Sequence, residues 1–250
     1  MNTELIAQLT AQLRGSVIQA GDQDYDKARA VYNAMHDRHP QMIVRANDVA
    51  DVVAAVNFAR DQELLLAVRG GGHSVPGFGT CDDGLVLDLG GMNSIYVNAA
   101  QTTVRVEGGC TLGDLDHATH AYGLAVPGGT VSTTGLAGLT LGGGMGHLSR
   151  SCALSCDNLI SADVVIASGE IISCDDKNHP DLFWAIRGGG GNFGVVTSFR
   201  FKAFPVESMF GGPTFFHLDA NYGPKHQRLK EIKALYDPGN LFRMNQNIAP

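Results

Sequence analysis

Three glycine-rich runs constrain the fold of this chain more than any other feature. The first, at residues 68–74, reads VRGGGHS and ends on His73 and Ser74; the second covers residues 127–146 and the third residues 187–194. Glycine has no Cβ atom, so such runs let the backbone approach a flat or charged ligand closely. Their N–H groups can also form a nest for an anion such as pyrophosphate. The sequence therefore predicts several ligand-binding loops on a folded scaffold.

The composition is that of a globular protein with special loops. Glycine occupies 32 of 250 positions, about twice its average usage of roughly 7%, but the glycines are clustered and the apolar content is ordinary. Lys and Arg total 18 against 25 Asp and Glu, with no basic stripe. This balance argues against nucleic acids and anionic membrane surfaces as partners.

The N-terminal residues predict an amphipathic helix, because Leu5, Ile6, Leu9 and Leu13 have helical spacing. They show neither the basic region nor the apolar region of a signal peptide, and no stretch of the chain reads as a transmembrane span. The five cysteines are odd in number and scattered, which is typical of reduced thiols. We therefore expect a cytoplasmic protein.

A zinc site is not expected. Cys152 and Cys156 lie four residues apart near His147, but no second pair of ligands accompanies them. His117 and His120 have a spacing that is compatible with a metal and that more often marks a solvated helix face. The sequence predicts no metal.

Predicted strands and helices alternate along the rest of the chain. Thr111 and Asp114 have the spacing of a capping box, which starts a helix that ends at Gly123. The pattern predicts an α+β domain with a mixed sheet over about residues 36–206. Strands are predicted at residues 43–44, 64–68, 85–89, 103–107, 163–167, 170–173 and 195–201, and further helices at 48–60 and 180–187.

Two common nucleotide-binding motifs are excluded by the residues and predicted elements around the glycine runs. Residues 189–194 match the glycine spacing of a Rossmann dinucleotide fingerprint, but a predicted helix precedes them and a predicted strand follows them, which is the reverse of the required order. The run that ends at His73 lacks the Gly-Lys-Ser/Thr ending of a phosphate-binding P-loop. Neither NAD nor a nucleoside triphosphate is expected.

Taken in order, the motifs resemble those of flavoproteins with the p-cresol methylhydroxylase and vanillyl-alcohol oxidase fold, in the berberine bridge enzyme-like branch that includes 6-hydroxynicotine oxidase. The resemblance covers about residues 36–250. It implies an FAD-binding domain with mixed sheets and flanking helices, followed by a short C-terminal berberine bridge enzyme-like segment. The motifs that carry it lie at residues 68–74, 127–132, 138–144, 156–159, 181–190 and 236–248.

The resemblance implies FAD, with its diphosphate on residues 69–74 and His73 attached to the 8α-methyl carbon of the flavin. A neutral imidazole is an available nucleophile for such a bond; the alternative is that His73 only hydrogen-bonds within a tight turn. Part of the family forms a second bond from a cysteine, and the matching position here is Val131, which implies a single attachment. The implied cofactor-binding residues are Arg69, Gly70, Gly71, Gly72, His73, Ser74, Gly128, Val131, Ser132, Gly135, Gly138, Gly142, Val196, Asn245 and Asn247.

Members of the family carry a substrate domain between the flavin domain and the closing motif, and nearly all of it is missing here. We expect N-terminal helices at 1–35, the FAD-binding domain at 36–206, a remnant of the substrate domain at 207–221 and the C-terminal segment at 222–250. The general base usually lies in the missing part, so no catalytic residue is assigned. An uncovered flavin face predicts self-association.

Two functional hypotheses follow. The first is an FAD-dependent oxidoreductase that moves hydride from a small organic substrate to a histidyl-linked flavin, with oxygen as the acceptor. The second is a truncated FAD-binding remnant without efficient turnover. The intact motifs favour the first hypothesis, and the missing segment favours the second.

Overall fold

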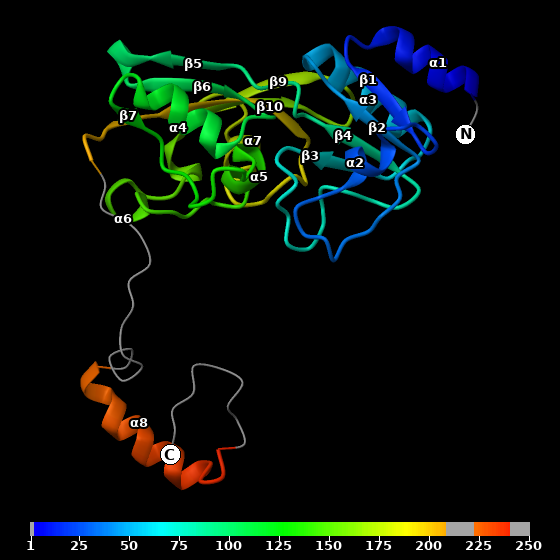
Figure 1. Ribbon diagram of the computed structural model, residues 1–250. Coiled ribbons are helices and arrows are strands. Elements are labelled where there is room, and N and C mark those ends of the chain that lie inside the picture. The colour runs from blue at the N-terminus through cyan, green and yellow to red at the C-terminus, as the bar shows by residue number, and fades with distance from the viewer. Residues whose placement is uncertain (1–2, 209–222, 241–250) are drawn as a thin grey trace. The chain divides into compact units, whose positions relative to one another are not determined.

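The computed structural model describes residues 3–208 and 223–240 (Figure 1). The chain forms two compact units, residues 1–208 and 209–250. The first unit contains two main sheets with helices packed against them. No helix in the described ranges combines the length and the apolar character that a membrane crossing requires.

The N-terminal sheet is mixed. Its strands lie in the order β1 (Ser16–Gln19), β2 (Met42–Arg45), β4 (Leu85–Asp88) and β3 (Leu66–Arg69). β1 is antiparallel to β2, whereas β2, β4 and β3 run parallel to one another. Both faces of the sheet are covered, which explains why its parallel strands read as continuous apolar runs.

Alternate side chains of β2 enter two different cores. Met42 and Val44 pack with α3 (Val49–Asp61), while Ile43 packs on the opposite face with α2 (Tyr25–Arg29). This is the period of two expected for a strand. α1 (Thr3–Gln12) lies beside α3 and adds Ile6 and Leu9 to the same core.

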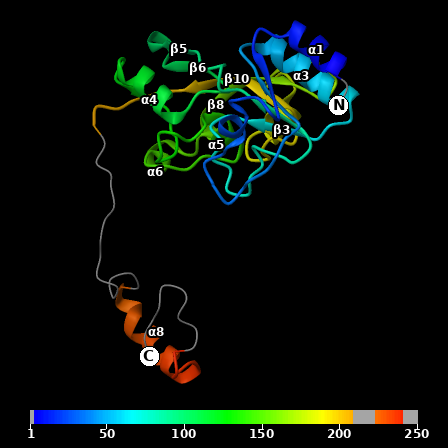
Figure 2. The same cartoon turned by 45° about the vertical axis from the view of Figure 1, so that its right-hand side comes forward.

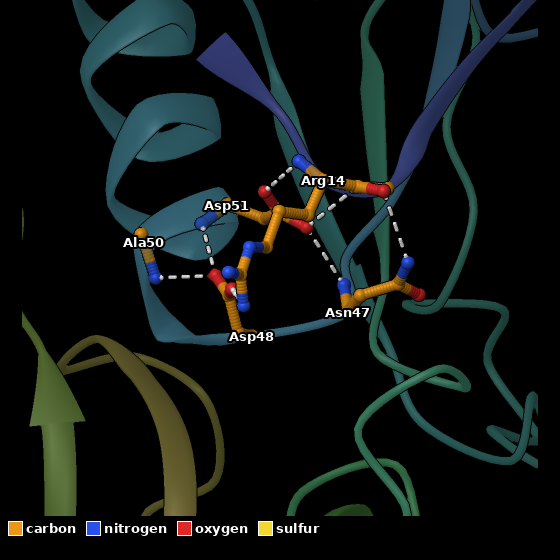
Figure 3. Close-up of polar contacts among 6 residues, drawn as sticks. Arg14, Asn47, Asp48, Ala50 and Asp51 are labelled. Carbon is orange, nitrogen blue, oxygen red and sulfur yellow. Dashed lines mark hydrogen bonds and ion pairs between the residues drawn. The ribbon is translucent and has the colours of Figure 1, made fainter.

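Two aspartates fix the start of α3 and hold the N-terminal segment against it (Figure 3). Asp48 caps the helix by accepting from two backbone N–H groups. Asp51 is 1% exposed, and its carboxylate accepts from the backbone N–H of Arg14 at 2.8 Å, Gly15 at 2.9 Å and Asn47 at 2.8 Å. A buried carboxylate is tolerated here because several donors surround it.

The second sheet is antiparallel throughout and is covered on one side by helices (Figure 1). α4 (Leu112–His120), α5 (Leu136–Leu141) and α7 (Pro180–Ala185) contribute to its core. The strand order is β5 (Ile95–Asn98), β6 (Thr103–Glu107), β10 (Val195–Lys202), β8 (Leu159–Val165) and β9 (Ile171–Asp175).

α3 connects the two sheets, because Val165 of β8 and Val195 of β10 pack in the same core as its apolar face (Figure 2). The sheets are therefore joined through one helix. The remaining elements are η1 (Ala99–Gln101), β7 (Leu124–Ala125), which pairs with β11 (Phe204–Pro205), α6 (Ser149–Cys152) and η2 (Cys156–Asn158). The second unit contains η4 (Gly223–Lys225) and α8 (His226–Tyr236).

The predicted α+β fold with a mixed sheet is confirmed. The capping box of Thr111 and Asp114 is present, but its helix ends at His120 rather than at Gly123. The expected N-terminal helices at 1–35 include a strand, β1, which completes the first sheet. The third glycine run follows α7 and precedes β10, so its context is the one that excludes a Rossmann fingerprint.

Candidate functional site

The His73 imidazole lies between an aromatic ring and two hydroxyl groups. The Tyr32 ring stacks on it with a centroid distance of 3.9 Å and an angle of 17° between the planes. Nε2 of His73 is 3.0 Å from Thr133 Oγ1, and Nδ1 of His73 is 3.5 Å from Thr134 Oγ1. The ring is half-buried, so it is oriented by contacts and still accessible.

The loop that follows β3 presents a row of N–H groups. Among the described residues, no protein acceptor bonds to the backbone N–H of residues 70–74. Half-buried N–H groups are normally paired, so adjacent unpaired ones fit an anionic ligand such as the diphosphate of FAD. The Ser74 hydroxyl is used within the loop, where it accepts from the N–H of Phe78 at 3.0 Å.

Direct contacts link the three glycine runs to one another. A Cβ atom on Gly71 would lie 2.2 Å from the backbone nitrogen of Gly135, so the first and second runs touch backbone to backbone. The third run joins the second, because the N–H groups of Gly188 and Gly190 both donate to the carbonyl of Leu141, at 3.0 and 2.9 Å. Runs that are distant in sequence are thus linked in a chain, from the first through the second to the third.

The second run supplies an open surface beside this loop. Val131, Ser132, Gly138 of α5 and Gly142, which follows α5, are exposed, and Gly128 is half-buried. A Cβ atom on Gly138 would meet nothing within 4 Å. The absence of side chains on this face of α5 leaves space for a ligand ring, which fits the implied flavin.

Two expected cofactor residues have their side chains in the scaffold. Arg69 is 6% exposed, and its guanidinium donates to Asp88 at 2.8 Å and to the carbonyl of Ala30 at 3.5 Å. Val196 is 3% exposed within the core of the second sheet. The Arg69 side chain therefore fixes the end of β3, from which the glycine loop starts, to Asp88. Asn245 and Asn247 lie outside the described residues.

The other candidate nucleophiles are less suited to a ligand. Burial raises the pKa of Cys110 to about 12 and that of Cys174 to about 11, so both remain thiols at neutral pH. Burial likewise raises the pKa of Cys156. His147 is exposed. In the part of the chain that the structure describes, no three potential metal ligands come together.

Sequence reasoning missed four residues of this site: Tyr32, Thr133, Thr134 and Asp88. The two threonines stand within the second glycine run, where hydroxyl side chains in a ligand-binding loop were a usable signal. Tyr32 has no such signal, because only the fold brings it to His73. Asp88 ends β4, next to Arg69 at the end of β3 in the parallel register.

Two family models match this chain, one over a long N-terminal region and one near the C-terminus. The family described as FAD binding domain matches residues 40–175, and the family described as berberine and berberine like matches residues 217–249. The chain is 45% identical over 249 residues to an FAD-linked oxidoreductase of Dictyostelium discoideum, which covers 99% of this chain and 54% of that protein.

Solved structures agree with this assignment. The crystal structure of 6-hydroxy-D-nicotine oxidase from Arthrobacter nicotinovorans matches with a TM-score of 0.78 and 38% identity, over 82% of this chain and 44% of that one. Glucooligosaccharide oxidase from Acremonium strictum, with a 6-S-cysteinyl, 8α-N1-histidyl FAD, matches with a TM-score of 0.75 and 32% identity, over 80% of this chain and 42% of that one.

The chain spans about half the length of the curated relatives that it matches. The FAD-binding match covers more than half of the chain, and the berberine-like match follows it in the order seen in the resemblance. The fold and the contacts between the glycine runs agree with both. The chain belongs to the FAD-binding-domain family of oxidoreductases, in its berberine bridge enzyme-like branch.

Proposed function

We propose that this chain holds FAD covalently through His73 and acts in an oxidoreductase that takes hydride from a small organic substrate, with oxygen as the acceptor. The observation that carries the proposal is the placement of His73. Its ring lies where the first and second glycine runs meet, next to a row of N–H groups without protein acceptors. Bound FAD would supply the two-electron chemistry.

Each part of the site has a role in this proposal. The N–H groups of residues 70–74 hold the diphosphate, and the open face of α5 receives the ring system. Val131 has no nucleophile, and burial keeps Cys110 and Cys174 protonated. These features support one bond to the protein, in contrast to the two bonds of the glucooligosaccharide oxidase.

The test of attachment is denaturation in acid, followed by removal of soluble flavin and measurement of flavin fluorescence on the polypeptide. We expect fluorescence on the wild type and none on His73→Ala. His147→Ala removes an exposed imidazole and serves as the matched control, with fluorescence equal to wild type. Flavin that washes out of the wild type would contradict covalent attachment, and a wild type that takes up no FAD would contradict binding.

A second function, FAD binding without efficient turnover, is favoured by one observation: the chain spans about half the length of its relatives. Transition-state stabilisation needs groups around the substrate as well as a cofactor. Anaerobic mixing with alcohols, amines and sugars separates the two functions. Bleaching of the flavin by a substrate supports the oxidoreductase, whereas bleaching by dithionite alone supports the binding protein.

A further inference from the structure

The contacts around His73 show that its ring is held in place from two sides. Tyr32 is 70% exposed, so burial of its ring contributes little to the stability of the fold. Yet its segment is fixed to the loop on both sides of His73. The Tyr32 N–H donates to the carbonyl of Gly72 at 3.1 Å, and the Asn33 side chain donates to the carbonyl of Val75 at 3.1 Å.

The two threonine hydroxyls make unequal contacts with the ring. Thr133 Oγ1 is 3.0 Å from Nε2, an ordinary hydrogen-bond distance, whereas Thr134 Oγ1 is 3.5 Å from Nδ1, near the limit for such a bond. A neutral imidazole carries a proton on one nitrogen and a lone pair on the other. A threonine hydroxyl can accept from Nε2–H or donate to a bare Nε2, so the 3.0 Å distance fits either tautomer. In the tautomer with Nε2–H donating to Thr133, Nδ1 keeps its lone pair and has only the weaker contact.

We propose that Thr133 and Tyr32 are positioning residues for flavin attachment: Thr133 holds the Nε2–H tautomer of His73, and Tyr32 holds the plane of its ring. The inference rests on the proposed covalent function. Thr133 is exposed, so a proton released from Nε2 can pass to water. Neither residue contacts the reacting carbon in this proposal; both act through His73.

The atoms and electrons of the attachment balance with oxygen as the oxidant. One bond forms, between Nδ1 of His73 and the 8α carbon of the flavin. One C–H bond at that carbon and the Nε2–H bond break. The two protons and two electrons released are taken up by dioxygen, which becomes hydrogen peroxide.

The experiment uses flavin-free protein of the full 250 residues, made in cells starved of riboflavin and then mixed with FAD in air. Covalent flavin is followed over time by fluorescence of the denatured polypeptide. We expect attachment about tenfold slower in Thr133→Val, a change equivalent to the loss of one hydrogen bond of ordinary strength. Thr133→Ser restores the hydroxyl and the rate. Thr130→Val, on the same exposed segment, is the matched control.

Tyr32 is tested in the same assay. Tyr32→Phe keeps the stacked ring and the wild-type rate, whereas Tyr32→Leu slows attachment. Affinity for an FAD analogue that lacks the 8α-methyl group is measured in parallel and is expected to be unchanged in all variants. Equal rates for Thr133→Val and wild type, or equal slowing by Thr130→Val, would overturn the role of Thr133.

A second readout does not depend on flavin. In flavin-free protein labelled with ¹⁵N-histidine, NMR reports which nitrogen of His73 carries the proton. We expect Nε2–H in the wild type and in Thr133→Ser, and a mixture of tautomers in Thr133→Val. An unchanged tautomer in Thr133→Val overturns the inference even if attachment occurs. A wild type that binds FAD without linking it overturns the covalent proposal, while the tautomer result still decides the role of Thr133.

Discussion

The first sheet and the glycine loop that follows β3 differ in whether their polar groups have protein partners. At the end of β3, the guanidinium of Arg69 is buried and paired with Asp88 at 2.8 Å. From the next residue onward, the N–H groups of residues 70–74 have no acceptor among the described residues. The border between polar groups with protein partners and N–H groups without them thus lies between Arg69 and Gly70.

This difference suggests a division of roles, in which the sheet determines the stability of the fold and the loop determines the binding of a ligand. The sheet gains stability by satisfying its own groups and by packing its apolar side chains on both faces. The loop leaves its donors without protein acceptors, and a bound anion could accept from several of them at once. Substitutions on the two sides of this border should therefore have separable effects on unfolding and on FAD binding.

The largest effect is expected from a cavity in the scaffold. Leu87 of β4 is fully buried in the core that contains α3. Leu87→Ala should lower the free energy of unfolding by about 3 kcal/mol, measured by urea denaturation of flavin-free protein. Leu65→Ala, at an exposed position, is the control. Once folded, the Leu87 variant should bind FAD as the wild type does, and a large loss of affinity would break the proposed separation.

A smaller effect is expected where scaffold and site touch. The methyl group in Gly135→Ala would lie 2.2 Å from the backbone nitrogen of Gly71, so the two loops must move apart. We expect a loss of about 2 kcal/mol in stability together with loss of FAD binding, measured by calorimetry and by flavin titration.

Gly138→Ala sharpens the same comparison, because its methyl group meets nothing within 4 Å. Stability of the flavin-free protein should not fall, since alanine is the better helix former, but FAD affinity should fall because the open face of α5 is filled. Wild-type affinity in Gly138→Ala would place the flavin elsewhere.

The smallest effect concerns the thiols of the core. Burial raises the pKa of Cys110 from its usual 9.0 to about 12. Between these two values the unfolded chain loses the proton and the folded chain keeps it, so stability falls as pH rises through this range. Urea midpoints at pH 8 and pH 10 should differ less in Cys110→Ala than in the wild type. An identical difference in both proteins would show that the thiol does not contribute.

Much of this architecture could be predicted from the sequence. α3 follows from its apolar spacing with Asp48 as its cap, and the start of α4 follows from a capping box whose residues are three apart. The ligand-binding loops follow from glycine, whose lack of a Cβ atom is visible in the sequence. These signals are local, so they do not depend on the rest of the chain.

The features that could not be predicted from the sequence depend on contacts between distant segments. β1 is short and only partly apolar, and it becomes a strand because β2 offers it a partner. The pairing of the Arg69 side chain with Asp88 depends on the parallel register of β3 and β4, which the sequence does not show. Tyr32 reaches His73 only in the folded chain, so no local pattern could have assigned it. Thr133 has the local signal of a hydroxyl in a glycine-rich loop, but its contact with His73 is set by the fold.

The contact between Gly71 and Gly135 joins segments that belong to the two different sheets. Gly71 follows a strand of the first sheet, and Gly135 precedes a helix that packs on the second. The loop contact at Gly71 and Gly135 is therefore complete only in molecules in which both sheets have formed and docked. A ligand that binds only this assembled state stabilises it by mass action.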